Sequence, residues 1–247
     1  MVSFAGVGGG AERLYKRQLA RIQRVAAEAR IPFRPAGRRW GVALPLKTID
    51  AVQAGSLRYR YRGMPMLKNP FDMALYPLVF WRSRPRTVIE IGSYKGVSAV
   101  WLADLIASVG ERGEVVSVDV EAPEPPEHRD NVRYLCGDAT RLGEVLTPEL
   151  LEALPRPWLV VEDSAHTYEA ASAVLQFFAP MMRPGEYLVI EDGVLSDMGW
   201  ARRYGGGPGL AISRFLEANP DFEIDAEICD LFGHNVTFNP NGYLRRR

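Results

Sequence analysis

Three carboxylates and one histidine follow two successive apolar runs of the chain. Asp163 and His166 come after the first run, and Glu191 and Asp192 come after the second. Each run is typical of a buried parallel strand, and open α/β sheets bind ligands at the edge where such strands end. Clustered carboxylates repel one another unless a cation lies between them, and hard oxygen ligands suit Mg2+ or Ca2+ better than zinc. An imidazole nearby can remove a proton, so this pattern predicts metal-assisted chemistry on a hydroxyl group.

The elements that must position these residues alternate between strands and helices from residue 71 onward. Apolar runs predict the strands, and periods near 3.6 residues predict the helices between them. Predicted strands cover residues 86–92, 113–119, 132–138, 158–162, 187–191, 222–225 and 236–238, and predicted helices cover 72–82, 97–108, 142–154, 168–182 and 210–218. This alternation predicts an α/β fold with a doubly wound, mostly parallel, seven-stranded Rossmann-like sheet.

A glycine-containing loop follows the first predicted strand, with the sequence Glu-Ile-Gly-Ser-Tyr-Lys-Gly at residues 90–96. A glycine turn between a strand and a helix lets a ligand approach the backbone closely. The loop is not the dinucleotide fingerprint, because Tyr94 stands where that motif has glycine. Glu90 disfavours a pyrophosphate and favours a cationic ligand, a demand that the amine and sulfonium of S-adenosylmethionine meet.

Two further acids end the next two predicted strands. Asp119 ends the second strand, where a carboxylate can accept both hydroxyls of a ribose. Asp138, followed by Ala139, ends the third strand, where its carboxylate can accept the exocyclic amine of a base. Three strand ends in succession, each with a suitable residue, therefore predict a nucleoside-containing cofactor along this edge of the sheet.

The first 70 residues have a different character. They carry 14 Lys and Arg against 3 Asp and Glu, whereas the remainder carries 16 against 27. Residues 12–30 predict a basic amphipathic helix, and residues 31–68 have no clear period and fit a segment that covers the site. We therefore divide the chain into residues 1–70, a basic N-terminal helical extension with a covering segment, and residues 71–247, the catalytic domain. Nucleic acid is not expected as a partner, because no nucleic-acid-binding motif accompanies the charge.

Composition excludes several other classes of protein. The chain has 247 residues, of which 47% are hydrophobic, enough for one good core. No apolar stretch approaches the ~18 residues of a membrane span, and the start lacks the apolar region of a signal peptide. The two cysteines, Cys136 and Cys229, have no metal-type spacing. We expect a protein of the cytoplasm without a membrane partner.

These motifs together resemble class I S-adenosylmethionine-dependent methyltransferases. More narrowly, the chain is similar to the family that holds the cephalosporin-biosynthesis methyltransferase once called a cephalosporin hydroxylase, and the rhamnosyl O-methyltransferases. Metal-dependent macrolide-sugar O-methyltransferases share its metal site. The resemblance runs from about residue 63 to the end of the chain, and its most specific pieces are residues 90–96, 162–166, 190–193 and 239–244.

The resemblance implies roles for individual residues. Asp163, Glu191 and Asp192 would be the Mg2+ ligands, and His166 would be the catalytic base, with Asp163 as the other candidate for that role. Cofactor binding is expected from residues of the strand-end loops and from a lysine that a lid could bring to the cofactor carboxylate: Glu90, Gly92, Ser93, Gly96, Asp119, Asp138, Ala139 and Lys68.

The expected activity is transfer of a methyl group from S-adenosylmethionine to a hydroxyl of a small natural product, such as the sugar of a glycoside in antibiotic biosynthesis. The resemblance also implies a homo-oligomer. Two alternatives stay open on sequence alone: a catechol-type O-methyltransferase, and a non-catalytic S-adenosylmethionine-binding partner of another biosynthetic protein. Intact predicted metal ligands and His166 argue against the second, since a scaffold needs neither.

Overall fold

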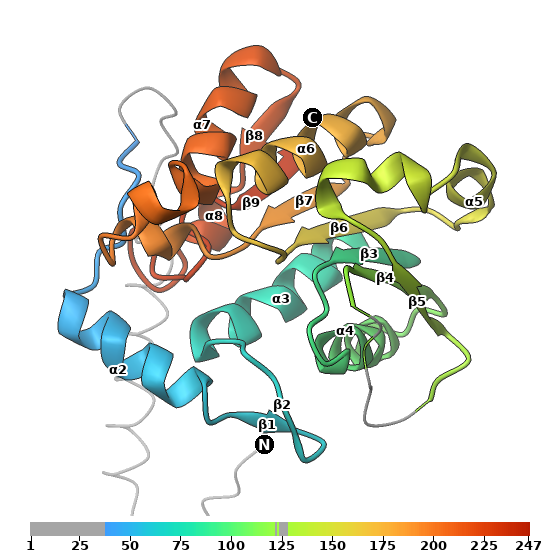
Figure 1. Ribbon diagram of the computed structural model, residues 1–247, viewed down its shortest axis with the longest axis horizontal. Coiled ribbons are helices and arrows are strands. Elements are labelled where there is room, and N and C mark those ends of the chain that lie inside the picture. Colours follow the sequence, from blue (N-terminus) through green and yellow to red (C-terminus); the bar gives the residue numbers. More distant parts are fainter. Residues whose placement is uncertain (1–37, 122, 124–127) are drawn as a thin grey trace, which may run out of the picture. The chain divides into compact units, whose positions relative to one another are not determined.

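The computed structural model describes residues 38–121, 123 and 128–247 (Figure 1). The basic helix predicted at residues 12–30 lies outside the described residues. Gly37–Arg247 forms one compact unit, so the covering segment from residue 38 to residue 70 packs within the same unit as the sheet. The domain boundary at residue 70 stays a prediction.

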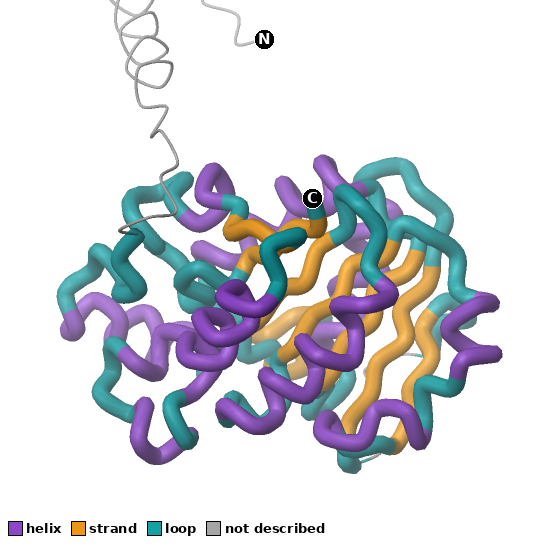
Figure 2. Tube along the Cα trace, turned by 90° about the horizontal axis from the view of Figure 1, so that it is seen from above, coloured by secondary structure: helices purple, strands orange, loops and turns teal. Residues whose placement is uncertain are grey.

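A seven-stranded sheet with the order β5-β4-β3-β6-β7-β9-β8 forms the centre of this unit (Figure 2). The strands are β3 (Thr87–Ile91), β4 (Glu114–Asp119), β5 (Val132–Cys136), β6 (Trp158–Glu162), β7 (Tyr187–Ile190), β8 (Phe222–Ile224) and β9 (Tyr243–Arg246). Strands β3 to β7 are parallel, and β9 runs antiparallel to both β7 and β8. The predicted doubly wound, mostly parallel Rossmann-like fold is confirmed.

Helices cover both faces of the sheet (Figure 1). The longer ones are α2 (Leu46–Ser56), α3 (Pro70–Ser83), α4 (Val97–Ser108), α6 (Tyr168–Phe178) and α7 (Gly207–Ala218), and the short ones are α5 (Pro148–Ala153), α8 (Ala226–Cys229), η1 (Ala139–Glu144), η2 (Ala179–Met181), η3 (Gly193–Ser196) and η4 (Ala201–Tyr204). Side chains of β3 alternate between two cores: Val88 packs on the α3 and α4 side, and Ile89 packs on the α6 and α7 side. None of the described helices is long and apolar enough to cross a lipid bilayer.

The prediction of a final strand at residues 236–238 is wrong. This segment is apolar and buried, but Thr237 Oγ1 and the Phe238 backbone N–H donate to the carboxylate of Asp72 on α3 instead of to a neighbouring strand. The final strand is β9, which contains arginines and carries little apolar signal. A buried polar contact with α3 therefore explains why the more apolar segment is a loop.

Two further predictions of secondary structure also need correction. The helix predicted at residues 142–154 is broken, because Thr147 caps a new helix by accepting from the Leu150 N–H at 3.3 Å, and Pro148 begins that helix. The segment expected to be irregular contains α2 and a short hairpin of β1 (Arg60–Tyr61) and β2 (Met64–Pro65). Helix α2 has no side-chain N-cap and no acid in its first turn, so it lacks the usual sequence signals.

Candidate active site

A cavity of about 820 Å3 opens along the carboxyl ends of the parallel strands. It reaches from the residues that follow β4 and β5 to those that follow β6 and β7. The sequence-predicted site residues in its wall are Lys68, Gly92, Ser93, Asp119, Asp138, Ala139, Asp163, His166 and Asp192. The other predicted residues, Glu90, Gly96 and Glu191, are not part of this wall. The carboxyl ends of several neighbouring strands thus line one cavity, and open α/β sheets bind ligands at this edge.

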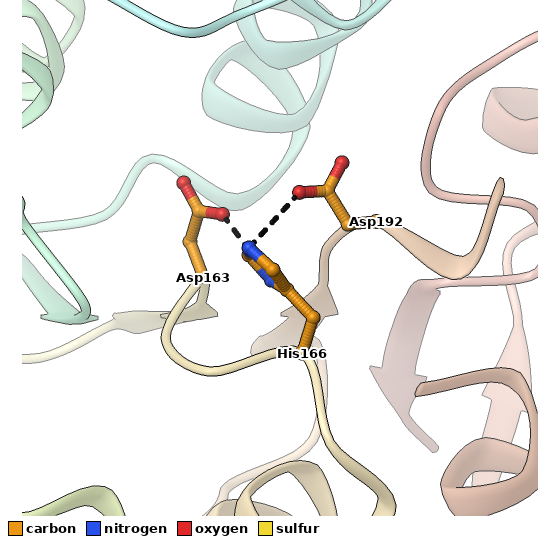
Figure 3. Close-up of side chains that lie close together, drawn as sticks. All are labelled: Asp163, His166 and Asp192. Carbon is orange, nitrogen blue, oxygen red and sulfur yellow. Dashed lines mark ion pairs between the residues drawn. The ribbon is translucent and has the colours of Figure 1, made fainter. Parts of the chain in front are cut away.

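Asp163, His166 and Asp192 form a compact group at one end of the cavity (Figure 3). The imidazole lies between the two carboxylates: its Nδ1 is 4.0 Å from Asp163 Oδ1, and its Nε2 is 3.4 Å from Asp192 Oδ2. Nδ1 is buried and has no hydrogen-bond partner among the described residues. Burial, with the nearby charge of Asp163, raises the pKa of Asp192 to about 6, although His166 opposes this shift.

Backbone hydrogen bonds hold the two aspartates in place. The Asp163 N–H donates to the Ile91 carbonyl at 2.8 Å, which fixes the end of β6 against the end of β3. The Asp192 N–H donates to Asn239 Oδ1 at 3.0 Å, and Asp192 has a left-handed φ of 56°. Asn239 is buried and lies 47 residues further along the chain, so no local sequence signal pointed to this positioning role.

The group can hold a metal ion. One ligand atom from each of Asp163, His166 and Asp192 lies within 4.8 Å of the others, the spacing expected when ligands surround a single ion. Two of the three ligand atoms are carboxylate oxygens, a donor set that suits a hard divalent cation. Two of the three predicted Mg2+ ligands, Asp163 and Asp192, therefore lie where they could bind the same ion.

Glu191 is turned away from this group. Its carboxylate accepts a hydrogen bond from the Tyr76 hydroxyl and lies 2.5 Å from Lys68 Nζ. The same ammonium lies 2.6 Å from Asp163 Oδ2, and the Lys68 side chain is only 4% exposed. Burial and the charge of Asp163 raise the pKa of Glu191 well above its usual range, and the two carboxylates raise the pKa of Lys68 against the effect of its own burial. Lys68 thus lies among the predicted metal ligands.

Asp119 forms hydrogen bonds with the backbone of the loop after β3. Asp119 Oδ2 accepts from the backbone N–H groups of Ser93 and Tyr94, at 2.7 and 2.8 Å, so this carboxylate holds the loop against β4. Its Oδ1 accepts from the Glu121 N–H at 3.2 Å, a longer contact that a stronger donor could replace. The Ser93 hydroxyl is buried without a partner in the described part of the chain.

The two glycines of the loop serve close packing. A Cβ on Gly92 would lie 2.2 Å from the Asp163 carbonyl oxygen, and the φ of Gly92 is 96°. A Cβ on Gly96 would lie 3.0 Å from the Tyr134 ring, whose hydroxyl donates to the Gly96 carbonyl. Because Gly92 has no side chain, the loop after β3 can pack directly against the backbone of Asp163.

Two buried glutamates lie in the carboxyl-terminal parts of β3 and β6, and each has one carboxylate oxygen without a partner in the described residues. Glu90 accepts from Ser117 Oγ at 2.6 Å and leaves Oε1 unpaired, and Glu162 accepts from the Ser164 N–H at 3.1 Å and leaves Oε2 unpaired. Burial raises the pKa of both groups to about 7. Glu162 was not among the predicted site residues, although it is the last residue of β6 and directly precedes Asp163.

The far end of the cavity is formed by Asp138 and Ala139. The Asp138 carboxylate accepts from the backbone N–H and the hydroxyl of Thr140, at 2.8 and 2.7 Å, and so caps η1. Both of these bonds go to Oδ1. Its other oxygen lies 3.7 Å from a guanidinium nitrogen of Arg141, too far for a hydrogen bond. One carboxylate oxygen therefore remains to accept a donor of a bound ligand.

The sheet order, the glycine loop after β3 and the acids after β4 and β5 together define the class I methyltransferase fold. Comparison with known proteins narrows this class. The family model for rhamnosyl O-methyltransferase/CmcI matches residues 54–247. The chain therefore belongs to this family of S-adenosylmethionine-dependent O-methyltransferases, as the sequence predicted.

Individual relatives agree with this assignment. The rhamnosyl O-methyltransferase of Mycobacterium leprae (strain TN) is 29% identical over 192 residues, which are 76% of this chain and 82% of the relative. Its counterpart in Mycobacterium tuberculosis (strain H37Rv) is 30% identical over 192 residues, covering 75% and 77%.

Solved structures of CmcI are also similar. An apo-structure of CmcI superposes with a TM-score of 0.60 at 28% identity, covering 77% of this chain and 76% of that one. A CmcI structure described as containing Mg and SAM gives a TM-score of 0.58 at 27% identity, with 77% of each chain covered.

Proposed function

We propose that the chain is a Mg2+-dependent O-methyltransferase that moves the methyl group of S-adenosylmethionine to a hydroxyl of a small hydroxylated natural product, such as a glycoside. The observation that carries this proposal is the placement of Asp163, His166 and Asp192 in the same cavity as the glycine loop. Methyl transfer needs an acceptor oxygen in line with the sulfur, and one continuous cavity permits that alignment. A CmcI structure described with Mg and SAM supports the same pair of ligands.

The residues divide the cavity between cofactor and acceptor. Asp138 and Ala139 at one end would hold the base, and Asp119 Oδ1 would accept from the ribose. The unpaired oxygen of Glu90 would favour the positive charge of the amino-acid end. Asp163, which follows β6 in the same cavity wall, would then lie beside the reacting end of the cofactor. The acceptor hydroxyl would therefore enter from the side of His166.

Asp163 and Asp192 would hold Mg2+ with oxygen ligands. S-adenosylmethionine supplies a methyl group on a positively charged sulfur, and Mg2+ supplies a positive charge that lowers the pKa of a nearby hydroxyl. Because Nδ1 of His166 is buried, the acceptor proton would be taken at Nε2. Asp192 Oδ2, 3.4 Å away, then stabilises the imidazolium that forms.

Calorimetry tests the proposal directly. We expect the full chain to bind S-adenosylmethionine, and to bind Mg2+ in a separate titration that chelation reverses. Asp163→Ala and Asp192→Ala should remove Mg2+ binding and retain cofactor binding. Cofactor binding without any Mg2+ site would leave a methyltransferase but refute the metal-dependent mechanism, and absence of both would refute the proposal.

The acceptor class is tested by a screen of glycosides against catechols, with methylated product measured by mass spectrometry. Methylation of the sugar hydroxyl of a glycoside is expected. Preference for a planar catechol would favour the catechol-type alternative, which uses the same metal chemistry.

A further inference from the structure

The Lys68 ammonium occupies a position among the acids that the proposed Mg2+ site requires. Nζ lies 2.6 Å from Asp163 Oδ2 and 2.5 Å from Glu191 Oε1, so it bridges the two carboxylates. It is also 5.9 Å from the centre of the Tyr76 ring, and its side chain is 4% exposed. A lysine this buried is retained only with charged partners, and here both partners are predicted metal ligands.

Two cations compete for the charge of these carboxylates at close range. Like charges a few ångströms apart repel strongly inside a protein, and a divalent ion doubles the repulsion that a monovalent ion would exert. Lys68 contacts Asp163 Oδ2, whereas Oδ1 is the oxygen that faces His166. Mg2+ held by Asp163 would therefore weaken the hold of that carboxylate on the ammonium. Departure of the ammonium would also free Glu191, which explains how a side chain now turned toward Lys68 can still serve as the third predicted ligand.

The position to which the ammonium can move is defined by the cavity. Lys68 is part of the cavity wall, together with Gly92 and Ser93 of the loop after β3. Because the acids at the ends of β4 and β5 suit the ribose and the base, the amino-acid end of the cofactor would lie toward β3 and β6, the side on which Lys68 contacts Asp163. That end carries a carboxylate, the natural partner of a displaced ammonium.

We propose that Lys68 is an exchangeable counter-cation that couples the two ligands of this enzyme. Without metal it neutralises Asp163 and Glu191, and with metal it transfers to the carboxylate of the bound cofactor. Each ligand therefore strengthens binding of the other, and linkage requires the same factor in both directions. This inference rests on the proposed function and adds to it a coupling residue.

The wild-type chain provides the first test, by calorimetry with two matched probes. S-adenosylhomocysteine carries the amino-acid carboxylate, and 5′-methylthioadenosine lacks the whole amino-acid end. Saturating Mg2+ should raise the affinity for S-adenosylhomocysteine about tenfold, within the usual range of coupling between sites, and leave that for methylthioadenosine unchanged. Equal effects on both probes, or none on either, would overturn the proposal without any mutation.

Two variants that each remove one positive charge test whether the coupling depends on Lys68. Lys68→Met should reduce the Mg2+ effect on S-adenosylhomocysteine to less than twofold. Lys95→Met is the control, because Lys95 also lines the cavity but is exposed, and its ammonium lies over the Tyr94 ring, 5.2 Å from the ring centre. Lys95→Met should keep the tenfold coupling, whereas coupling that survives in Lys68→Met would refute the role of Lys68.

Failure of this inference differs from failure of the proposed function. Independent binding of Mg2+ and S-adenosylhomocysteine to the wild type would refute only the coupling. Absence of Mg2+ binding would refute the metal-dependent mechanism itself. Near-ultraviolet circular dichroism checks that Lys68→Met retains its tertiary structure, and the probe comparison on the wild type stands if it does not.

Discussion

Two groups of buried acids in this molecule differ in how completely their hydrogen bonds are satisfied. Asp72 on α3 is fully buried, and its carboxylate accepts from Asn69, Thr237, Tyr243 and the Phe238 backbone N–H. At the strand ends, by contrast, carboxylate oxygens of Glu90 and Glu162, the Ser93 hydroxyl and Nδ1 of His166 are buried without a partner in the described residues. Burial of an acid is thus common to both groups, and unused hydrogen-bonding capacity distinguishes the strand-end group, for which we propose ligand binding.

His166 provides the largest expected effect. His166→Asn, chosen because asparagine tolerates the left-handed φ of 56° at this position, should lower turnover ~10²–10⁴-fold, the usual contribution of a general base. Binding of S-adenosylmethionine should change little. His128→Asn is the matched control, since His128 is exposed and outside the cavity. Normal turnover of His166→Asn in a coupled assay would refute the base assignment.

Asp72 should matter for stability and not for chemistry. Asp72→Ala leaves four buried donors without their acceptor, so we expect a loss of about 3 kcal/mol in the free energy of unfolding. For a chain of this size that lowers Tm by about 6–12 °C. Affinity for S-adenosylhomocysteine, measured well below Tm, should stay within about threefold. A large loss of affinity in the folded variant would show that the two groups of acids are not separate.

Glu90 should show the opposite behaviour, with a smaller effect on stability. Its pKa of about 7 lies above the ordinary value of 4.5, so the folded state holds a proton that the unfolded state releases. Its contribution to stability is therefore present below pH 4.5 and lost as the pH rises through 7.

Glu90→Gln removes this pH dependence. The variant should match the wild type at pH 5 and melt about 2–6 °C higher at pH 8, while its affinity for the cationic S-adenosylmethionine falls about tenfold. Scanning calorimetry across this range, paired with binding titrations, measures both. Lower stability at pH 8 would contradict the assignment of Glu90 as an unsatisfied acid.

The sequence predicted the parallel half of the sheet well, because its strands are continuous apolar runs between helices with a clear period. Helix α4 was predicted with its observed bounds, and β6 likewise. The last strand could not be predicted locally. Residues 236–238 have the stronger strand propensity, but they form a loop whose hydrogen bonds go to Asp72 and Val194, both distant in sequence.

The same distinction applies to the site. Asp163, His166 and Asp192 were found because each follows a strand end, and the topology of the sheet then brings them together. The contacts that decide the state of the site join residues far apart in sequence. Lys68 is 95 residues from Asp163, and no period or motif in the chain indicates that their side chains meet.

The close approach of Gly92 to the Asp163 carbonyl also constrains how this protein can evolve. A side chain at residue 92 would collide with the backbone from which the acidic group begins. A substitution at residue 92 therefore changes the loop after β3 and the position of Asp163 at the same time.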